Sequence, residues 1–445
     1  MTEFLSATVD FVWGLPLVLF LFGANFILLW HSKFLPLSGV WHAIKLLGHK
    51  EKSSAEGQIS HFQTFCNAIA ATVGLGNISG VAIAVSQGGP GTVFWMWFAA
   101  IIGMNTKFFE CSSALMFRGK DYRGEVQGGA MYTIPKVFSS RWTWLAMMFA
   151  TCGMIGTLSM FQINQLGSYI TEQYSVPGWQ SGVFFAVITM WVLRGGLKRL
   201  SDTCSAIVPV MSVVYVVTCL VILAKHIDII PSVIADIFRH AFTAQSALYG
   251  TLSYGIIHVM VTGIKRATFS NEAGLGTAPM AHSNSKTNEP ISEGYVAMLG
   301  PLLDTLVVCT LTALVILVSF PDELPKLNGI RMTMAAFESN LGGAGRHLLG
   351  ISILLFAYST MLGMANYNEK CWDYIFRGRW GMGKNAFQAW YILTILLGSV
   401  LAMENVLNLI DIAYALMTIP NILVTVAVAP QVKAALKDYN RRLRT

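Results

Sequence analysis

Charged residues are scarce in this chain of 445 residues, where Asp, Glu, Lys and Arg together make up 12% of the sequence. Typical soluble domains carry about 25%, so the composition argues against a soluble enzyme or binding domain. Hydrophobic residues account for 54%, and the mean hydropathy is +0.56. Several apolar runs reach the ~20 residues that cross a bilayer as a helix. The sequence therefore predicts an all-α membrane protein that crosses the lipid bilayer many times.

Motifs of redox, metal and nucleotide chemistry are also missing. The seven cysteines are scattered without a C-x-x-C pair, which argues against a disulfide framework or a zinc site. No Gly-x-x-x-x-Gly-Lys-Ser/Thr sequence is present, and the glycine after Gly74-Leu75-Gly76 comes four residues on, at Gly80, so a dinucleotide fingerprint is also excluded. We expect no organic cofactor. The net charge of +7 lies in loops on one side and does not indicate a nucleic-acid partner.

The apolar runs predict eleven membrane-spanning segments. They lie near residues 11–30, 61–86, 91–117, 142–171, 179–193, 204–224, 247–285 (broken), 295–319, 347–368, 386–402 and 405–429. If the N-terminus is outside, the inner connections hold 22 Lys and Arg residues and the outer ones hold 5. Because Lys and Arg collect in cytoplasmic loops, we expect an outside N-terminus and a cytoplasmic C-terminus in a bacterial-type inner membrane. The acidic, Lys- and Arg-free start is not expected to be a signal peptide.

The spans divide into one extra helix and two groups of five. Because five is odd, the two groups enter the membrane from opposite sides, which predicts a 5+5 inverted-repeat core. The predicted regions are 1–60 (extra helix and cytoplasmic connector), 61–224 (first repeat), 225–246 (outer loop with a possible short helix), 247–430 (second repeat) and 431–445 (basic tail at the cytoplasmic lipid surface).

Each predicted repeat opens with a glycine-rich interruption. The first is Gly74–Gly80, inside an apolar stretch, and the second is Phe269–Gly276, in a stretch that begins near Ala247. Non-helical backbone persists at membrane depth only where it lines a cavity or is buried in protein. Paired Gly-interrupted segments in the two halves of a chain point to a transporter's substrate site. A small-residue face for helix packing is the alternative for the first interruption.

Unwinding between Val73 and Asn77 would free backbone groups for binding. The N-terminal end of the resumed half-helix would favour a carboxylate, and carbonyls of the preceding half-helix, from Ala70 to Val73, would favour Na⁺. Asn77 adds a side-chain carbonyl. Ser359 and Thr360, at the middle of a span, can offer two hydroxyl oxygens to a small hard cation, or can bond back to their own helix.

The second interruption places Ser270, Asn271 and Glu272 in apolar sequence. A carboxylate at membrane depth costs at least ~2.5 kcal/mol and is a functional-site hypothesis by default. We expect Glu272 to hold the broken helix, with acceptance of a substrate ammonium group as the alternative. Lys265 and Arg266 are candidate partners for this carboxylate or for Asp304.

Four further ionisable side chains lie in the predicted spans. Lys107 and Glu110 are three residues apart, so they can face each other on one helix, and a self-neutralising structural pair is favoured over a proton path. Asp304 and Asp411 fit either helix locking or ion coupling, and the sequence does not separate the two.

Single polar side chains also mark individual spans. Gln162 and Asn164 lie in the 142–171 segment, where each amide can face a cavity or bond to a neighbouring helix. His258 stands alone at membrane depth, without the nucleophile or metal cluster that a membrane enzyme needs. A channel would need a ring of like charges, so both of these classes are disfavoured.

Together these motifs resemble the sodium:alanine symporter family, which belongs to the amino acid–polyamine–organocation superfamily and shares the leucine/neurotransmitter symporter fold. The resemblance extends from about Phe11 to Pro430. The residues that carry it are Gly74–Ala82, Gly88–Gly91 with Phe94–Trp97, Phe269–Pro279 with Ala281–His282, Val296–Gly300 with Asp304–Thr305, and Met417–Asn421.

The resemblance implies Na⁺-coupled uptake of a small neutral amino acid, such as alanine or glycine, by alternating access in a monomeric transport unit. The implied substrate-binding residues are Leu75, Gly76, Asn77, Gln162, Phe269, Ser270, Asn271, Gly274 and Met364. The implied sodium ligands are Ala70, Val73, Phe356, Ser359 and Thr360.

Two positions depart from the family pattern. Thr277 replaces the more usual serine of Gly-Ser-Ala-Pro, which is a conservative change. Met364 stands where alanine transporters carry tryptophan. Because methionine is smaller and more adaptable, a larger substrate such as glutamine is an alternative, as is H⁺ coupling.

Overall fold

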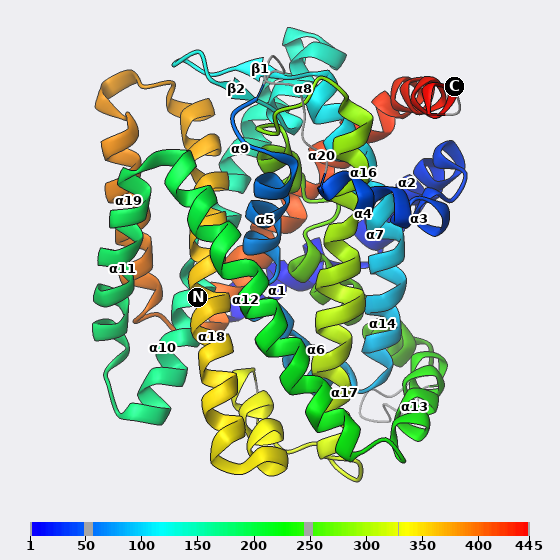
Figure 1. Ribbon diagram of the computed structural model, residues 1–445, viewed down its shortest axis with the longest axis vertical. Coiled ribbons are helices and arrows are strands. Elements are labelled where there is room, and N and C mark those ends of the chain that lie inside the picture. The colour runs from blue at the N-terminus through cyan, green and yellow to red at the C-terminus, as the bar shows by residue number, and fades with distance from the viewer. Residues whose placement is uncertain (1, 49–56, 244–251, 328, 444–445) are drawn as a thin grey trace.

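The computed structural model describes residues 2–48, 57–243, 252–327 and 329–443. Most helices run along the long axis of the molecule, with the β1–β2 hairpin and α8 at one end and α13 towards the other (Figure 1). The elements up to the hairpin are α1 (Thr2–Val12), α2 (Leu15–Ser32), α3 (Leu35–Ser38), α4 (Val40–Leu47), α5 (His61–Thr72), η1 (Gly76–Gly80), α6 (Val81–Gly88), α7 (Gly91–Met116), β1 (Gly119–Lys120) and β2 (Val126–Gln127).

The remaining elements are helical. They are α8 (Ala130–Phe138), η2 (Ser140–Trp142), α9 (Thr143–Gly156), α10 (Met160–Tyr174), α11 (Gly178–Arg194), α12 (Gly196–Lys225), α13 (Ile230–Phe242), α14 (Leu252–Asn271), α15 (Ala278–His282), α16 (Pro290–Pro301), η4 (Leu302–Cys309), α17 (Thr310–Ser319), α18 (Ile330–Phe376), η5 (Arg379–Gly381), α19 (Lys384–Gly398) and α20 (Met403–Arg442).

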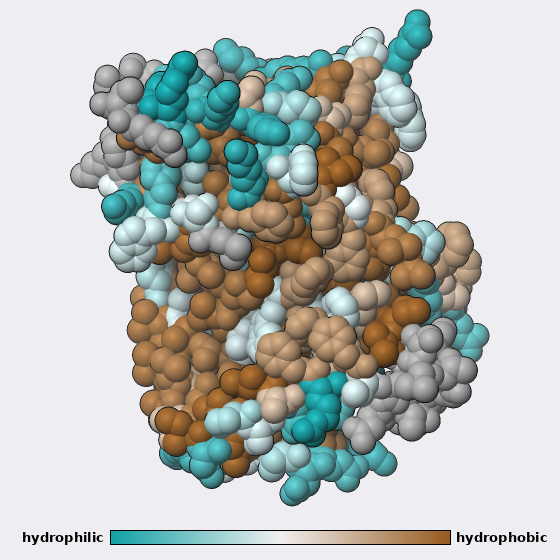
Figure 2. Space-filling view, turned by 90° about the vertical axis from the view of Figure 1, so that its right-hand side faces the viewer, coloured by the Kyte–Doolittle hydropathy of each residue, from teal (hydrophilic) through white to brown (hydrophobic). Residues whose placement is uncertain are grey.

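The surface fits a bilayer. Figure 2 shows hydrophobic residues over the middle of one face and hydrophilic residues gathered towards both ends. Within the described residues, six helices are long and apolar enough to cross a membrane, and α5 with the bent η1–α6 segment makes a seventh. Helices also occupy the described parts of the other predicted spans, but the count of eleven and the inverted repeat stay predictions.

Several elements differ from the sequence prediction. The first span, expected over 11–30, is two helices that part at Trp13 and Gly14, where Pro16 opens α2. The 142–171 span is interrupted between α9 and α10, at residues 157–159. The hairpin was not expected, and α20 runs through Pro430 to Arg442, so most of the predicted tail continues a helix. Residues 49–56, 244–251 and 444–445, which include the junction of the predicted outer loop with the second repeat, lie outside the described residues.

The start of α5 and the start of α18 both position the first interruption. Ser60 and Gln63 form a reciprocal capping box, which satisfies free N–H groups at the start of α5. At the other end of the molecule, α18 is kinked at Gly342 (φ 57°, ψ −140°), and its first segment covers η1, where Thr333 Oγ1 donates to the Ile78 carbonyl at 3.2 Å. The first interruption is therefore covered from this side.

Candidate functional site

The chain leaves the helix at the first predicted interruption. α5 ends at Thr72, and the axis turns by 47° before the segment formed by η1 and α6. Val73 (φ −78°, ψ 85°) is not helical, so its carbonyl turns away from the helix direction. The Gly74 N–H donates to Asn77 Oδ1 at 3.0 Å. In a continuous helix it would donate to the carbonyl of Ala70, so that oxygen is released from its usual partner.

The second predicted interruption is also present. α14 ends at Asn271, and three of the next five residues have positive φ: Glu272 (56°), Gly274 (91°) and Gly276 (82°). Glycine adopts this conformation without steric cost, whereas glutamate does not. The buried Glu272 carboxylate accepts from Thr277 Oγ1 at 2.6 Å, across the turn. This bond supports the expected structural role of Glu272.

Asp304 connects the two interruptions. Its carboxylate accepts from Asn77 Nδ2 of the first interruption and, at 3.0 and 3.1 Å, from Ser270 Oγ of the second. Thr305 Oγ1 donates to the same carboxylate at 2.8 Å and accepts from Asn271 Nδ2 at 3.0 Å. Asp304 lies in the π-helical turn η4 and is fully buried. The sequence marked this residue but gave it no place in the site.

Thr360 lies directly against the first interruption. Its Oγ1 atom is buried and has no hydrogen-bond partner among the described residues, and a Cβ atom on Gly74 would stand 2.2 Å from it. Close packing continues one turn along α18, where a Cβ atom on Gly363 would lie 2.5 Å from the Ala71 nitrogen. The Thr360 hydroxyl beside Gly74 and the Ala70 carbonyl that the break releases are oxygen donors of the kind that small hard cations take. These residues fit Na⁺.

Ser359 is placed less clearly for an ion. Its hydroxyl donates to the Phe356 carbonyl of its own helix at 3.1 Å and lies 3.2 Å from Met211 Sδ on α12. Ser359 therefore bonds back to its own helix, which was one of the two predicted alternatives. Thr360 does not, because its Oγ1 atom has no hydrogen-bond partner among the described residues. Of the two adjacent hydroxyls, the one on Ser359 is hydrogen-bonded to its own helix, whereas the one on Thr360 is available to bind an ion.

Two helices, α10 and α14, carry further residues that the resemblance implies in substrate binding, and α14 packs against the first interruption. Phe269 lies against Gly76, where an added Cβ atom would be 3.3 Å from Phe269 Cδ1, and its ring is 5.2 Å from that of Phe161. Gln162, which follows Phe161 in α10, is buried, and within the described parts of the chain its Oε1 atom has no hydrogen-bond partner. Asn164 instead donates to the Gly398 and Leu401 carbonyls at 3.1 and 2.6 Å, so this amide joins helices.

Leu75 and Met364 are buried as well. Leu75 is fully buried within the first interruption, and Met364 is 5% exposed one turn after Thr360 in α18. The implied contacts of both breaks and of α18 therefore lie in the protein interior.

Lys265 and Arg266 do not contact the expected carboxylates. Both bind Asp411 of α20 instead, at 3.7 and 2.8 Å, and Trp13 Nε1 donates to the Asp411 carbonyl at 2.9 Å. The prediction that they pair with Glu272 or Asp304 was wrong, because α14 turns this face towards α20. The arrangement favours helix locking for Asp411.

The predicted Lys107–Glu110 pair is not a direct contact, since no ion pair within 4 Å joins these two residues in the part of the chain described. Glu110 accepts from Asn421 Nδ2, which also donates to the Gly274 carbonyl at 2.8 Å. Glu110 therefore supports the second interruption from α7 through α20. Lys107 is buried and interacts electrostatically with both Glu110 and Glu272.

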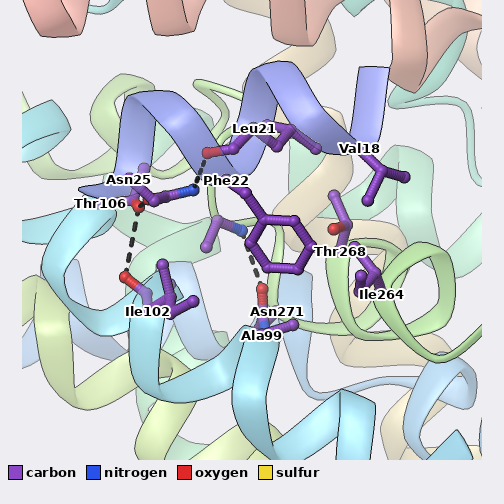
Figure 3. A pocket seen from close by; sticks show the side chains of 12 residues that line it. Val18, Leu21, Phe22, Asn25, Ala99, Ile102, Thr106, Ile264, Thr268 and Asn271 are labelled. Atoms are coloured by element: carbon purple, nitrogen blue, oxygen red, sulfur yellow. Dashed lines mark hydrogen bonds between the residues drawn. The ribbon is translucent and has the colours of Figure 1, made fainter. Parts of the chain in front are cut away.

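A small cavity of about 30 Å³ lies beside the second interruption, between α2, α7 and α14 (Figure 3). Thr268 and Asn271 approach it from α14, and on the opposite side Asn25 accepts from Thr106 and donates to the Leu21 carbonyl at 2.8 Å. Such a volume holds about one water molecule. The cavity is too small for an amino acid.

Comparison with known proteins agrees with this architecture. A model of the sodium:alanine symporter family matches residues 1–445. The sodium/alanine symporter AgcS of Methanococcus maripaludis is 36% identical over 441 residues, covering 97% of this chain and 95% of that protein. The probable sodium/glutamine symporter GlnT of Bacillus subtilis is 31% identical over 436 residues, covering 97% and 89%. The crystal structure of MhsT in complex with L-phenylalanine superposes with a TM-score of 0.58 at 15% identity, covering 83% of this chain and 89% of that one, and so shows a shared fold.

Proposed function

This chain belongs to the sodium:alanine symporter family, and from that membership we propose that it carries a small neutral amino acid into the cell together with Na⁺. Proteins of this family are symporters, so the chain is a membrane transporter and not an enzyme. We assign the substrate to alanine or glycine first, because the family and AgcS are named for alanine. Glutamine is the second candidate, because GlnT is named for it and Met364 leaves more room than tryptophan.

The observation that carries the proposal is the meeting of the two interruptions through Asp304, with Thr360 beside the first. In the proposed mechanism, Na⁺ binds between the carbonyls of Ala70 in α5 and of Val73 just after it, and the α18 residues Phe356, Ser359 and Thr360. Binding there fixes the first interruption.

With the first interruption fixed, the amides of Leu75 and Gly76 face the carboxylate of the amino acid. Gln162, Phe269 and the 270–274 segment, together with Asn77 and Met364, complete the substrate site. Because each ligand stabilises the form that binds the other, the coupling is reciprocal.

We also propose that the N-terminus lies outside and the C-terminus in the cytoplasm. The hairpin end, which carries Arg118, Arg123 and Lys136, is then the cytoplasmic end. The 5+5 inverted repeat and the monomeric transport unit belong to the same proposal.

A competition panel in proteoliposomes tests this function. Purified protein is reconstituted, and uptake of labelled alanine is measured against L- and D-amino acids under a Na⁺ gradient, an H⁺ gradient or neither. We expect uptake that needs the Na⁺ gradient and is competed by alanine and glycine, or by glutamine. Uptake that follows only the H⁺ gradient would contradict Na⁺ coupling, and no competition by any neutral amino acid would contradict the substrate class.

Met364→Trp is expected to narrow the substrate range towards alanine and glycine. The larger ring fills space beside the substrate, so competition by glutamine should fall by about tenfold or more, which corresponds to ~1.4 kcal/mol. The control is Met364→Leu, which conserves volume and should keep the original range. An unaltered competition profile in the tryptophan variant would place Met364 outside the cavity.

A further inference from the structure

The last turns of α20 are docked against α4 near the hairpin end of the molecule. Figure 1 shows this red part of α20 at the edge of the molecule, on the same side as the blue α2, α3 and α4. Tyr439 Oη and His42 Nε2 of α4 are hydrogen-bonded at 2.9 Å, and the Tyr439 ring packs against Tyr295 of α16. Val432 and Leu436 are buried along the same face of the helix. One face of this segment is therefore fixed to the helix bundle.

The outer face of the same segment is basic. Lys433, Lys437 and Arg441 are exposed and follow one another at intervals of four residues, so they form one stripe along about 12 Å of helix. Arg441 pairs with Asp438 at 2.7 Å. Neither lysine of the stripe takes part in an ion pair within 4 Å in the part of the chain that the structure describes. The stripe therefore keeps positive charge at the surface.

The ends of α2 and α4 bring two further lysines to this region. Lys433 interacts electrostatically with His31 in the last turn of α2, and Lys33 follows directly after that helix. In α4, burial lowers the pKa of His42, and the charge of Lys45 lowers it further. Both Lys33 and Lys45 are exposed. Basic side chains from three separate segments therefore surround the contact between α4 and α20.

Large aromatic side chains stand exposed beside these lysines. Trp30 at the end of α2 is 79% exposed, Phe34 before α3 is 55% exposed, and Trp41 in α4 is 70% exposed. Exposing such rings to water is unfavourable, whereas aromatic rings are enriched at the level of the lipid headgroups. Aromatic and basic side chains together are typical of helices that lie in the membrane interface. The region therefore fits the headgroup layer of the bilayer.

We propose that Lys33, Lys45, Lys433, Lys437 and Arg441, the basic patch, bind the headgroup of an anionic phospholipid. A lipid explains both features of the region, since its phosphate attracts the basic side chains and its acyl chains cover the exposed rings. A soluble anion or an acidic protein segment would explain the charge alone. A headgroup bound there joins the end of α20 to α2 and α4. The proposal depends neither on the transported substrate nor on the coupling ion.

The test measures the local enrichment of phosphatidylglycerol around α20 in the full chain, reconstituted in phosphatidylcholine vesicles that contain a minor fraction of this lipid. Ala434→Cys, an exposed position beside the stripe, receives a fluorophore after the seven native cysteines are replaced. A nitroxide quencher near the headgroup end of an acyl chain is carried either by phosphatidylglycerol or by an equal amount of phosphatidylcholine. Labelled phosphatidylglycerol is expected to quench about threefold more strongly or better. High salt should reduce this ratio, because it screens exposed charges.

A variant without the stripe should lose the enrichment. Lys433→Gln, Lys437→Gln and Arg441→Gln in one chain are expected to bring the quenching ratio to about one, since each basic side chain near an anionic surface contributes about fivefold in binding. All three side chains are exposed, so their replacement should leave the fold intact. Lys433→Arg with Lys437→Arg conserves the charge and should keep the ratio.

The matched control removes three exposed basic side chains from other connections that the sequence places on the same side of the membrane. It combines Arg194→Gln, Lys198→Gln and Arg379→Gln. The quenching ratio should stay as in the unmodified chain. An equal loss in this control would assign the enrichment to the overall charge of the protein and would overturn the basic patch as a site.

A quenching ratio of about one in the unmodified chain, or a ratio that the stripe variant leaves unchanged, would also overturn the proposal. A ratio that high salt does not reduce would contradict binding through charge. The measurement needs no uptake. A wrong substrate or coupling ion would therefore change the proteoliposome transport results and leave the quenching ratios intact.

Discussion

Asp304→Ala is expected to abolish Na⁺-dependent amino acid uptake, with the rate falling at least tenfold, and to lower thermal stability. The Asp304 carboxylate accepts from Asn77, Ser270 and Thr305 in a fully buried place. Alanine leaves these donors without an acceptor, at about 1–3 kcal/mol for each group that water cannot reach. Because the donors belong to both interruptions and to η4, their loss releases the two halves of the site from each other. Initial uptake rates in proteoliposomes and the unfolding temperature in detergent measure the two effects.

Two further variants show whether the effect of Asp304→Ala comes from the lost hydrogen bonds at this position or would follow the removal of a carboxylate elsewhere. Asp304→Asn keeps one acceptor oxygen, so we expect partial uptake and a smaller loss of stability. Asp236→Ala removes an exposed carboxylate that pairs with Arg239 within α13 at 3.0 Å. Exposed pairs contribute about 0–1 kcal/mol, so this control should behave as the unmodified chain. Normal uptake by Asp304→Ala would show that the carboxylate does not hold the interruptions together.

The positions of the two interruptions could be predicted because their cause is local. Gly274 and Gly276 have the positive φ values that their residue type permits, and the break after Val73 follows from a glycine-rich sequence in apolar surroundings. The Thr360 hydroxyl could also be predicted as a candidate ligand, since a polar group in the middle of a span must find a partner.

Pairings between distant segments could not be predicted in the same way. Asn77 and Asp304 are 227 residues apart. No pattern in the sequence around either residue indicates that the two side chains form a hydrogen bond. Arg266 could equally have met Asp304, and the choice of Asp411 depends on how α14 turns towards α20. The hairpin that carries Arg123 lacks the length and alternation of a predictable strand, because each strand has only two residues. Tertiary packing decides these features.

Thr360→Val is expected to raise the Na⁺ concentration for half-maximal uptake at least tenfold. The double variant Ser359→Ala with Thr360→Ala is expected to abolish the stimulation of uptake by Na⁺. Valine keeps the shape of threonine and removes only the oxygen. That oxygen is buried without a partner beside Gly74, so in the absence of Na⁺ its removal should leave thermal stability unchanged or slightly higher. The stabilisation that Na⁺ gives over K⁺ should shrink, because a ligand that binds the folded state more weakly stabilises it less. Uptake against Na⁺ concentration and unfolding temperature in each salt provide the two readouts.

The combination of these two readouts identifies an ion ligand. A hydroxyl that served only the fold would lower stability in every salt when removed. Thr418→Val is the matched control, because this buried hydroxyl donates to the Tyr414 carbonyl of its own helix at 2.8 Å. It should lose a little stability in Na⁺ and K⁺ alike and keep its Na⁺ dependence. If Thr360→Val behaved as Thr418→Val does, the oxygen beside Gly74 would not be a sodium ligand, and the coupling ion would have to bind elsewhere in the interruptions.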